Sequence, residues 1–307
     1  MALNGQIKAL KGFAQYFRLY RNKVFVIKLG GAVLADLDVR NSAAQQCALL
    51  ADMGIRVVIV HGGGPQTSEL SRKLGAEPVI IGGRRVTDDA ALDVVKMVIA
   101  GRINVDLVAA LRRAGARPVG ISGIDAGLIL ADRRPPVLMR ENGAERTVDF
   151  GNVGDIREVH TEVLDHLLAG GYTPVISCLG ATEDGSPLNI NADILAETLA
   201  ATLKAKKLVY MTDQPGVLRD LKDRSTLLPF ADLADLKDLL ESGAIAGGMK
   251  LKVEACLRAA TNGVKRTHII DGTAKDSLLV EVFTGEGCGT MIVGEREKQI
   301  YQEKELA

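Results

Sequence analysis

The sequence predicts an α/β fold in which an open, mainly parallel sheet is sandwiched between helices. Apolar segments of strand length alternate with helical patterns along the chain, which is typical of parallel sheets covered on both faces. Two of these segments end in glycine-rich loops, and open α/β sheets bind ligands at such strand ends. The chain has 307 residues, of which 47% are apolar, so we expect two lobes with a sizeable core.

The first part of the chain alternates between the two kinds of element. Short continuous apolar runs, typical of strands buried on both faces, predict strands at 24–27, 57–60, 118–121 and 174–177. Apolar residues spaced three and four apart predict helices at 41–53, 66–74, 88–113 and 162–168. Between 128 and 159 the chain has Pro135-Pro136, short apolar pairs and several glycines, which predict hairpins instead of helices.

The last third repeats the alternation. Helices are expected at 192–203, 232–242, 252–262 and 278–283, and strands at 208–211, 268–270 and 291–293. The boundary between the lobes is expected near 204–207, after one helix and before the next strand. The predicted lobes are therefore 22–205 and 206–307.

Charge and cysteine content narrow the function classes. Lys plus Arg is 38 and Asp plus Glu is 38, and a balanced charge argues against binding to nucleic acid or a membrane surface. No apolar run reaches the ~20 residues of a membrane span. The four cysteines show neither CxxC nor zinc spacing, so we expect free thiols in a reducing, cytoplasmic compartment and no protein-held metal.

Residues 1–21 are predicted to form a separate helix. Ile7, Leu10, Phe13, Phe17 and Tyr20 recur at spacings of three and four residues, as one helix face does. A helix placed before the first strand has little core to enter, so its aromatic face favours docking on another chain. Packing on its own domain is one alternative, and a transit peptide, indicated by the acid-poor start, is another.

Two glycine loops give the strongest local signal of a phosphate site. Lys28-Leu29-Gly30-Gly31 and His61-Gly62-Gly63-Gly64-Pro65 each follow an apolar strand. Glycines let backbone N–H groups approach a phosphate closely, and the next helix N-terminus adds a favourable dipole. Lys28 then indicates a phosphate contact, with a solvated lysine as the alternative. His61, directly before three glycines, is better interpreted as orienting the backbone than as a general base.

Four further motifs belong to the same set. Gly83-Arg84-Arg85-Val86-Thr87-Asp88 offers an arginine fork suited to a carboxylate. Asn189-Ile190-Asn191-Ala192-Asp193 opens a helix, and capping explains only one of its three Asx residues. Thr212-Asp213-Gln214-Pro215-Gly216-Val217 follows a strand, and Gly247-Gly248-Met249-Lys250-Leu251-Lys252 places lysines beside glycines.

In this order the motifs resemble those of the amino acid kinase family. The resemblance covers about residues 23–293 and is strongest to the branch that phosphorylates N-acetyl-L-glutamate in arginine biosynthesis. It includes two supporting stretches, at 119–125 and 154–156. Leu29, Gln214 and Leu251 depart from residues common in the family. The resemblance implies the amino acid kinase fold, with acetylglutamate and dimer contacts in the first lobe and MgATP in the second.

The resemblance also assigns catalytic roles. Lys28 and Lys252 would flank the transferred γ-phosphoryl group, and Asp193 would hold both lysines. Lys250 competes with Lys252 for its role. Gly30, Gly31, Gly63 and Gly64 would line the path of the phosphate and carboxylate, and Arg85 and Asn189 would hold the α-carboxylate end of acetylglutamate. The nucleotide would lie beside Gly30 and Gly31 of the first loop and beside Thr212, Asp213, Gly216, Val217 and Gly248.

The implied reaction needs no catalytic base. Its nucleophile, the γ-carboxylate of acetylglutamate, has a pKa of about 4.3 and is ionised at neutral pH. Transfer then depends on alignment and charge neutralisation by the two lysines, Mg²⁺ and backbone donors. ATP is the implied phosphoryl donor. It would hold Mg²⁺ mainly through its own oxygens, because no protein carboxylates show ligand spacing.

Regulation is implied as well. Family members inhibited by L-arginine have an extra N-terminal helix that interlaces between dimers to form a hexamer, a trimer of dimers. This chain has such a segment with Tyr16, and sequences resembling the arginine site surround His268, Glu281 and Gly287. We therefore expect a homo-hexamer inhibited by L-arginine. A solvated Glu281 and a core His268 are the alternatives.

Several rival functions stay open. An acetylaminoadipate kinase would need a longer pocket, and a UMP or aspartate kinase would need different residues in the second motif. A non-catalytic sensor of arginine or nucleotide is disfavoured by the intact lysine pair and Asp193. A Rossmann dehydrogenase is disfavoured because GxGxxG follows no strand.

Overall fold

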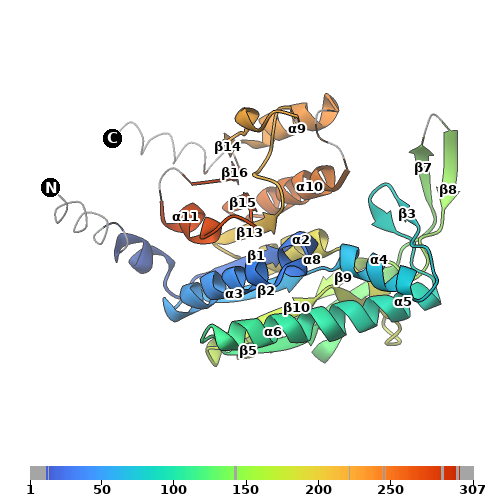
Figure 1. The fold of residues 1–307 in the computed structure, drawn as a ribbon, viewed down its shortest axis with the longest axis horizontal. Coiled ribbons are helices and arrows are strands. Elements are labelled where there is room, and N and C mark those ends of the chain that lie inside the picture. Colours follow the sequence, from blue (N-terminus) through green and yellow to red (C-terminus); the bar gives the residue numbers. More distant parts are fainter. Residues whose placement is uncertain are drawn as a thin grey trace.

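A computed structural model describes residues 12, 14–141, 144–220, 222–243, 245, 247–284, 287–294 and 297. Its centre is an eight-stranded sheet with the order β14-β16-β15-β13-β1-β2-β10-β5 (Figure 1). The strands are β1 (Val24–Leu29), β2 (Arg56–His61), β5 (Pro118–Ser122), β10 (Thr173–Ser177), β13 (Lys207–Thr212), β14 (Phe230–Ala231), β15 (Arg266–Asp271) and β16 (Thr290–Val293). All neighbours are parallel except β15 and β16. The predicted open, mainly parallel sheet is confirmed.

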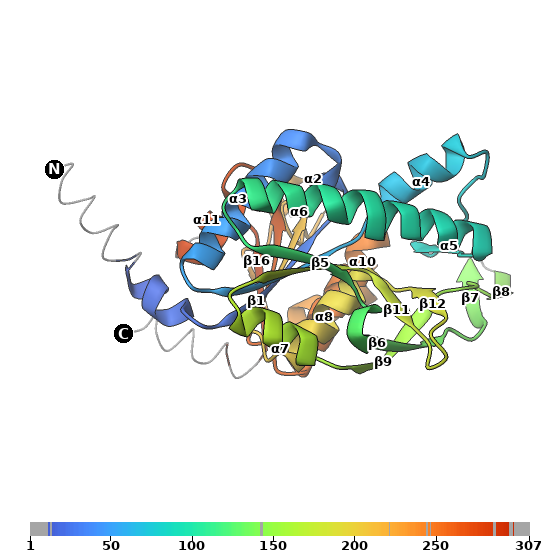
Figure 2. The same cartoon turned by 90° about the horizontal axis from the view of Figure 1, so that it is seen from below.

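Helices cover both faces of this sheet, as predicted (Figure 2). One face carries α2 (Gly31–Ala35), α3 (Leu37–Asp52), α4 (Gly64–Lys73), the long helix α5–η1–α6 and α11 (Ser277–Phe283). The long helix consists of α5 (Asp89–Val95), the π-helical segment η1 (Lys96–Ile103) and α6 (Asn104–Arg113). The other face carries α7 (Glu162–Ala169), α8 (Ala192–Thr202) and α10 (Gly247–Thr261), and α9 (Leu233–Glu241) packs on α10.

The core follows the apolar runs of the central strands. In β1, β2 and β13 nearly every residue is buried, as expected for parallel strands covered on both faces. The polar exceptions at the carboxyl ends of β1 and β2 are Lys28 and His61, and both are buried. The sheet therefore brings these two side chains to one edge of the core.

Smaller sheets and hairpins lie at that edge. Strands β6 (Ile129–Arg133), β9 (Gly154–Val159), β11 (Leu179–Ala181) and β12 (Pro187–Asn189) form a four-stranded sheet. The hairpins β3 (Ile80–Ile81) with β4 (Arg84–Arg85) and β7 (Val137–Glu141) with β8 (Ala144–Val148) project from one end of the molecule (Figure 1). The hairpins predicted for 128–159 are confirmed.

Some elements differ from the sequence prediction. Helix α10 begins at Gly247, five residues before the expected 252, because the apolar pattern starts only after two glycines of low helix propensity. Six short elements were not predicted: α2, β3, β4, β11, β12 and β14. The same is true of the single turns η2 (Asp125–Gly127) and η3 (Arg224–Thr226). Such segments are too short to show a period.

The N-terminal helix is described at residue 12 and over 14–20. The rings of Tyr16 and Tyr20 stack with their centroids 5.9 Å apart. Tyr16 also packs edge-on against Phe283 at 6.0 Å, and Tyr20 packs edge-on against Phe25 at 5.1 Å. For these two rings, packing on their own chain is the correct alternative. Ile7, Leu10 and Phe13 lie outside the described residues, so docking of that part on another chain stays a prediction.

The expectation of free thiols is confirmed. All four thiols are free, and Cys47, Cys178 and Cys256 are buried whereas Cys288 is exposed. Within the described part of the chain, no helix combines the length and apolar character needed to cross a membrane.

Candidate active site

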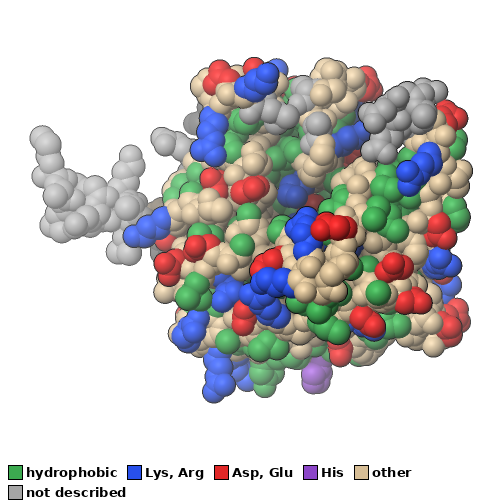
Figure 3. Space-filling view, turned by 45° about the vertical axis from the view of Figure 1, so that its right-hand side comes forward, with side chains coloured by type: hydrophobic (Ala, Val, Ile, Leu, Met, Phe, Trp, Pro, Cys, Tyr) green, Lys and Arg blue, Asp and Glu red, His purple; other side chains and the backbone are tan. Residues whose placement is uncertain are grey.

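A cavity of about 260 Å³ lies at the carboxyl ends of β1, β2 and β10, beside the N-terminus of α8. Basic side chains gather near the centre of the face shown in Figure 3. The charged and amide side chains that line the cavity are Lys28, Arg84, Arg85, Arg134, Asn189, Asn191 and Asp193. With four cations and one carboxylate, this lining suits an anionic ligand.

Asp193 joins the two predicted catalytic lysines. Its Oδ1 lies 2.7 Å from the Nζ of Lys28, and its Oδ2 lies 3.2 Å from the Nζ of Lys252. Burial alone would raise the pKa of Asp193, but the two ammonium groups outweigh it, and the pKa is lowered. Burial, and next the charge of Lys28, lower the pKa of Lys252. The carboxylate thus stays ionised and fixes two cations a short distance apart.

Rigid elements hold this trio. Lys28 is inside β1, paired with Tyr210 on one side and Val60 on the other. The hydroxyl of Tyr210 donates to the carbonyl of Asp193 at 3.1 Å. Asn191 caps α8 by accepting from the amide of Asp193 at 2.9 Å. Strand pairing and a helix cap therefore determine where the charged groups lie.

The structure distinguishes the two lysines of α10. The side chain of Lys252 is 14% exposed and donates to Asp193. Lys250 lies on the exposed side of the same helix. Only Lys252 is therefore brought to Lys28 and Asp193.

The two glycine loops are tied to each other. Gln66 of α4 donates to the carbonyl of Gly31 at 2.7 Å, and Thr67 donates to the carbonyl of Gly63 at 2.8 Å. A Cβ at Gly31 would lie 2.7 Å from Cδ of Pro65, so only glycine fits there. Gly31, Gly63 and Gly64 line the cavity, whereas Gly30 packs on the end of β13 through a 2.8 Å bond to Met211.

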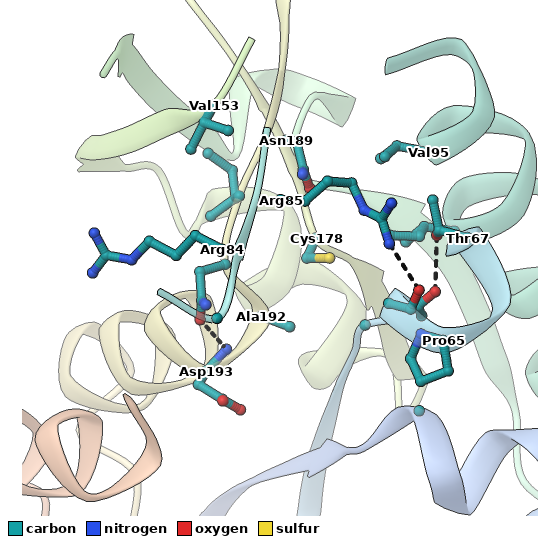
Figure 4. A pocket seen from close by; sticks show the side chains of 18 of the residues that line it. Pro65, Thr67, Arg84, Arg85, Val95, Val153, Cys178, Asn189, Ala192 and Asp193 are labelled. Carbon is teal, nitrogen blue, oxygen red and sulfur yellow. Dashed lines mark hydrogen bonds between the residues drawn. The ribbon is translucent and has the colours of Figure 1, made fainter. Parts of the chain in front are cut away.

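Arg85 and Asn189 lie on the side of the cavity away from Asp193 (Figure 4). The guanidinium of Arg85 donates to the carbonyl of Gly64 at 2.9 Å and to the Ser68 hydroxyl at 2.6 Å. Burial, and next the charge of Arg72, lower the pKa of Arg85. Asn189 donates to Thr87 at 3.2 Å. The neighbouring Arg84 points to the opposite side in Figure 4.

Outside the first glycine loop, the predicted nucleotide residues divide into three groups. Thr212 and Asp213 follow β13, next to the Lys28 loop, and are hydrogen-bonded to each other at 3.1 Å. Gly216 and Val217 pack against Thr290, whose hydroxyl oxygen accepts a hydrogen bond from the Val217 amide at 2.8 Å. Gly248 lies in the first turn of α10 beside open space. The 260 Å³ cavity touches none of these residues.

Sequence reasoning missed several cavity residues. Arg134 is 6% exposed and binds Asp155 through Nε at 3.1 Å and through Nη2. Its position depends on the pairing of β6 with β9, which no local pattern reveals, although Asp155 lies in the supporting stretch 154–156. Cys178 lines the cavity directly after β10, and that strand-end position was an available signal.

A second cavity of about 160 Å³ lies on the opposite part of the sheet, between the N-terminal helix and α11. Tyr16, His268, Glu281 and Gly287, the four predicted arginine-site residues, all line it. Glu281 accepts from the amides of Cys288 at 2.7 Å and Gly289 at 3.0 Å. It is 6% exposed, so the solvated alternative is wrong.

A buried chain of side chains leads from Glu281 into the sheet. His268 donates through Nδ1 to Glu281 at 2.6 Å, and Lys207 lies 2.9 Å from the other ring nitrogen. Burial lowers the pKa of His268 to about 4 and that of Lys207 to about 7. Burial opposes ionisation of Glu281, but the bonds it accepts from His268 and two amides lower its pKa to about 2. His268 is thus the core histidine of the stated alternative and also lines the cavity.

Residues 23–271 match the model of the amino acid kinase family. The chain is 46% identical over 293 residues to an acetylglutamate kinase of Myxococcus xanthus, and the match covers 95% of each chain. Among solved structures it resembles N-acetylglutamate synthase from Neisseria gonorrhoeae complexed with coenzyme A and N-acetyl-glutamate, with a TM-score of 0.81 and 28% identity. That match covers 94% of this chain but only 63% of the synthase.

The same synthase complexed with coenzyme A and L-arginine is also similar, with a TM-score of 0.77 and 26% identity over 94% of this chain and 65% of the synthase. The family match spans most of the chain and contains both glycine loops, the trio around Asp193 and the residues after β13.

Proposed function

The chain belongs to the amino acid kinase family, and from this premise we propose that it transfers the γ-phosphoryl group of ATP to the γ-carboxylate of N-acetyl-L-glutamate. The products are ADP and N-acetyl-L-glutamyl 5-phosphate, an intermediate of arginine biosynthesis. Near-complete coverage at 46% identity to an acetylglutamate kinase supports the substrate. The observation that carries the proposal is the pair of lysines held by Asp193 at the cavity.

The geometry suits transfer between two anions. The substrate γ-carboxylate is already a nucleophile at neutral pH, so the protein has to align it and offset negative charge. Lys28 and Lys252, with one carboxylate between them, leave a net positive charge where the phosphoryl group moves. Arg85 and Asn189, on the other side of the cavity, would bind the α-carboxylate end.

ATP would bring its own magnesium. Within the described ranges, no three His, Cys, Asp or Glu side chains are grouped so as to hold a metal. Asp193 is fully engaged by two lysines. These residues therefore fit a Mg²⁺ held by phosphate oxygens, where it would neutralise charge on the β- and γ-phosphates. Thr212, Asp213 and Gly248 are the residues that we propose to lie beside the nucleotide.

The test uses purified full-length protein, ATP and Mg²⁺ with four acceptors: acetylglutamate, acetylaminoadipate, aspartate and UMP. ADP release is followed for all four, and hydroxylamine traps the acyl phosphates as hydroxamates. We expect ADP and hydroxamate with acetylglutamate as the best acceptor. A greater kcat/KM with another acceptor would overturn the assignment of acetylglutamate as the substrate. The absence of turnover with all four acceptors would favour a non-catalytic sensor.

We also propose that L-arginine, the end product, inhibits by binding the second cavity. The ionised Glu281 carboxylate would pair with the guanidinium group, and Tyr16 and Gly287 lie at the same cavity. The similar synthase solved with L-arginine supports this proposal. Arginine would inhibit by binding one conformation more tightly than another.

Millimolar arginine should lower activity and raise the melting temperature, whereas citrulline, which lacks the charge, should do neither. Glu281→Gln should abolish both effects while activity without arginine persists. Unchanged inhibition in that variant would place the arginine site elsewhere. We further propose that the protein is a cytoplasmic hexamer in which the N-terminal segment before Tyr16 interlaces between dimers, and that its thiols are free in a reducing compartment.

A further inference from the structure

His61 and Asn104 form a buried pair behind the second glycine loop. His61, the last residue of β2, has no exposed surface, and Asn104, the first residue of α6, is 6% exposed. The amide nitrogen of Asn104 lies 3.0 Å from Nε2 of His61, and Nδ1 of His61 lies 3.1 Å from the carbonyl oxygen of Gly62. The pair therefore connects a helix to a peptide group of the loop that lines the active-site cavity.

The contacts of Asn104 determine where the ring proton lies. Its amide nitrogen also donates to the carbonyl oxygen of Val175 at 3.0 Å, so the NH₂ group, and not the amide oxygen, faces His61. Nε2 of His61 must then accept a hydrogen bond from Asn104. Nδ1 must carry the ring proton and donate a hydrogen bond to the carbonyl oxygen of Gly62. Burial lowers the pKa of His61 to about 4, which is consistent with a neutral ring held in this single tautomer.

The tautomer orients a backbone donor. In a trans peptide the carbonyl group and the following N–H group point in opposite directions. Because the Gly62 carbonyl points at the buried ring, the N–H of Gly63 points away from that ring, and Gly62, Gly63 and Gly64 all line the cavity. Thr67 restrains the next peptide by donating to the carbonyl of Gly63 at 2.8 Å.

The surrounding elements are shaped to place Asn104. The π-helical segment η1 ends directly before it, and such segments occur often at functional sites. A Cβ at Gly63 would overlap Cδ1 of Ile103, which immediately precedes Asn104. A Cβ at Gly120 on β5 would overlap the amide oxygen of Asn104. This close approach gives Gly120, in the stretch 119–125, a structural reason to be glycine.

We propose that Asn104 is a positioning residue for phosphoryl transfer. It locks the Nδ1–H tautomer of His61, and His61 in turn holds the N–H of Gly63 toward the transferred group. This inference rests on the proposed function for its kinetic consequence, but the tautomer it requires is a property of the protein alone. It also explains why His61 is not a base, since both ring nitrogens are engaged.

The first experiment reads the tautomer directly. The chain has four histidines, so ¹⁵N-histidine spectra of the full-length protein, with His61 assigned by His61→Gln, resolve each ring. We expect protonated Nδ1 and unprotonated Nε2 in the wild type. Asn104→Ala should introduce the Nε2–H form, whereas Val105→Ala, the exposed next residue of α6, should not. A wild-type Nε2–H tautomer, or an unaltered ring in Asn104→Ala, would overturn the proposal.

The second experiment measures kinetics on the same proteins. Asn104→Ala should lower kcat about 10- to 100-fold, with the KM for ATP nearly unchanged. This decrease is at most that expected when a hydrogen-bond donor to the transition state is removed. Asn104→Asp can keep Nδ1–H only as an imidazolium, so its kcat should fall as pH rises from 6 to 8, unlike that of the wild type. Gly120→Ala, which displaces Asn104, should act in the same direction as Asn104→Ala.

Unchanged kcat in folded Asn104→Ala would contradict the positioning role. If Asn104→Ala fails to fold, the pH profile of Asn104→Asp and the spectrum of Gly120→Ala decide instead. If the wild type does not phosphorylate acetylglutamate, the proposed function is wrong. The ¹⁵N spectra still test the tautomer of His61, because that measurement does not depend on activity.

Discussion

The carboxylate of Asp193 fixes the separation of two ammonium groups that would otherwise repel each other. Its pKa is lowered because the two lysines outweigh the effect of burial. Removing one partner from a buried ion pair leaves an uncompensated charge, which is strongly unfavourable. The position of each lysine therefore depends on the other two members of the trio.

Lys252→Ala should lower kcat on the order of 10² or more, because one preorganised charge donor for the phosphoryl group is lost. Lys250→Ala is the matched control on the same helix and should change kcat little, since Lys250 is exposed. Steady-state kinetics with acetylglutamate and ATP compare them. A dispensable Lys252 combined with an essential Lys250 would show that α10 is oriented differently during catalysis. Lys28→Ala should resemble Lys252→Ala.

Arg85→Ala should raise the KM for acetylglutamate far more than the KM for ATP, because a carboxylate contact is lost. Arg84→Ala is the matched control, since the side chain of Arg84 points to the other side of the cavity (Figure 4). The measurement is KM for each substrate at saturation of the other. Equal increases in both KM values would remove Arg85 from the acetylglutamate site.

At the residue scale, motif reasoning selected side chains that the structure brings together. Lys28, Asp193, Arg85 and Asn189 all line one cavity, because strand ends and helix starts converge at one edge of a parallel sheet. Arg134 could not be found in this way. It reaches the cavity through the pairing of β6 with β9 and through Asp155, and such long-range pairing leaves no local signature.

At the element scale, the regular strands and helices were predictable because their burial is periodic or continuous. The π-helical segment η1 was not, since 88–113 shows one helical pattern throughout. The tyrosine pair was assigned to another chain because the helix precedes the first strand. In the structure, α11 and β1 supply Phe283 and Phe25 as its partners.

The N-terminal helix allows a test of assembly that preserves this packing. Deleting residues 1–13 keeps Tyr16 and Tyr20 on their own chain, so kcat should stay within about twofold. If the deleted part interlaces between dimers, sedimentation should show dimers in place of hexamers, and arginine inhibition should weaken sharply. If the shortened protein keeps the oligomeric state of the full-length protein, the interlacing is refuted, while the kinase assignment is unaffected.

At the scale of the whole molecule, two buried histidines make stability depend on pH. The pKa of His61 and of His268 is about 4 in the folded protein against 6.5 in the unfolded chain. Between pH 6.5 and 4 the unfolded state binds more protons, so the free energy of unfolding falls as pH falls. The loss should be on the order of 3 kcal/mol per histidine at most.

Urea unfolding at several pH values checks this. His268→Gln should be less stable than the wild type at pH 7, because the amide does not reproduce the packing of the buried ring, but should lose less stability between pH 6.5 and 4. His160→Gln, a change at an exposed histidine, should keep the wild-type slope. An unaltered slope in His268→Gln would contradict its titration in that range.

The strand order has a mechanical consequence. β1 and β13 pair in parallel from Phe25 with Lys207 to Leu29 with Met211, so strands from before and after residue 205 form one continuous plate. Two domains joined by a flexible peptide can rotate about that peptide. This continuous sheet can move only by elastic twisting unless the hydrogen bonds between β1 and β13 break. Any movement that brings the nucleotide toward Lys28 should therefore be small at each strand and spread over many. Amide protons of β1 and β13 should accordingly exchange no faster during turnover than at rest.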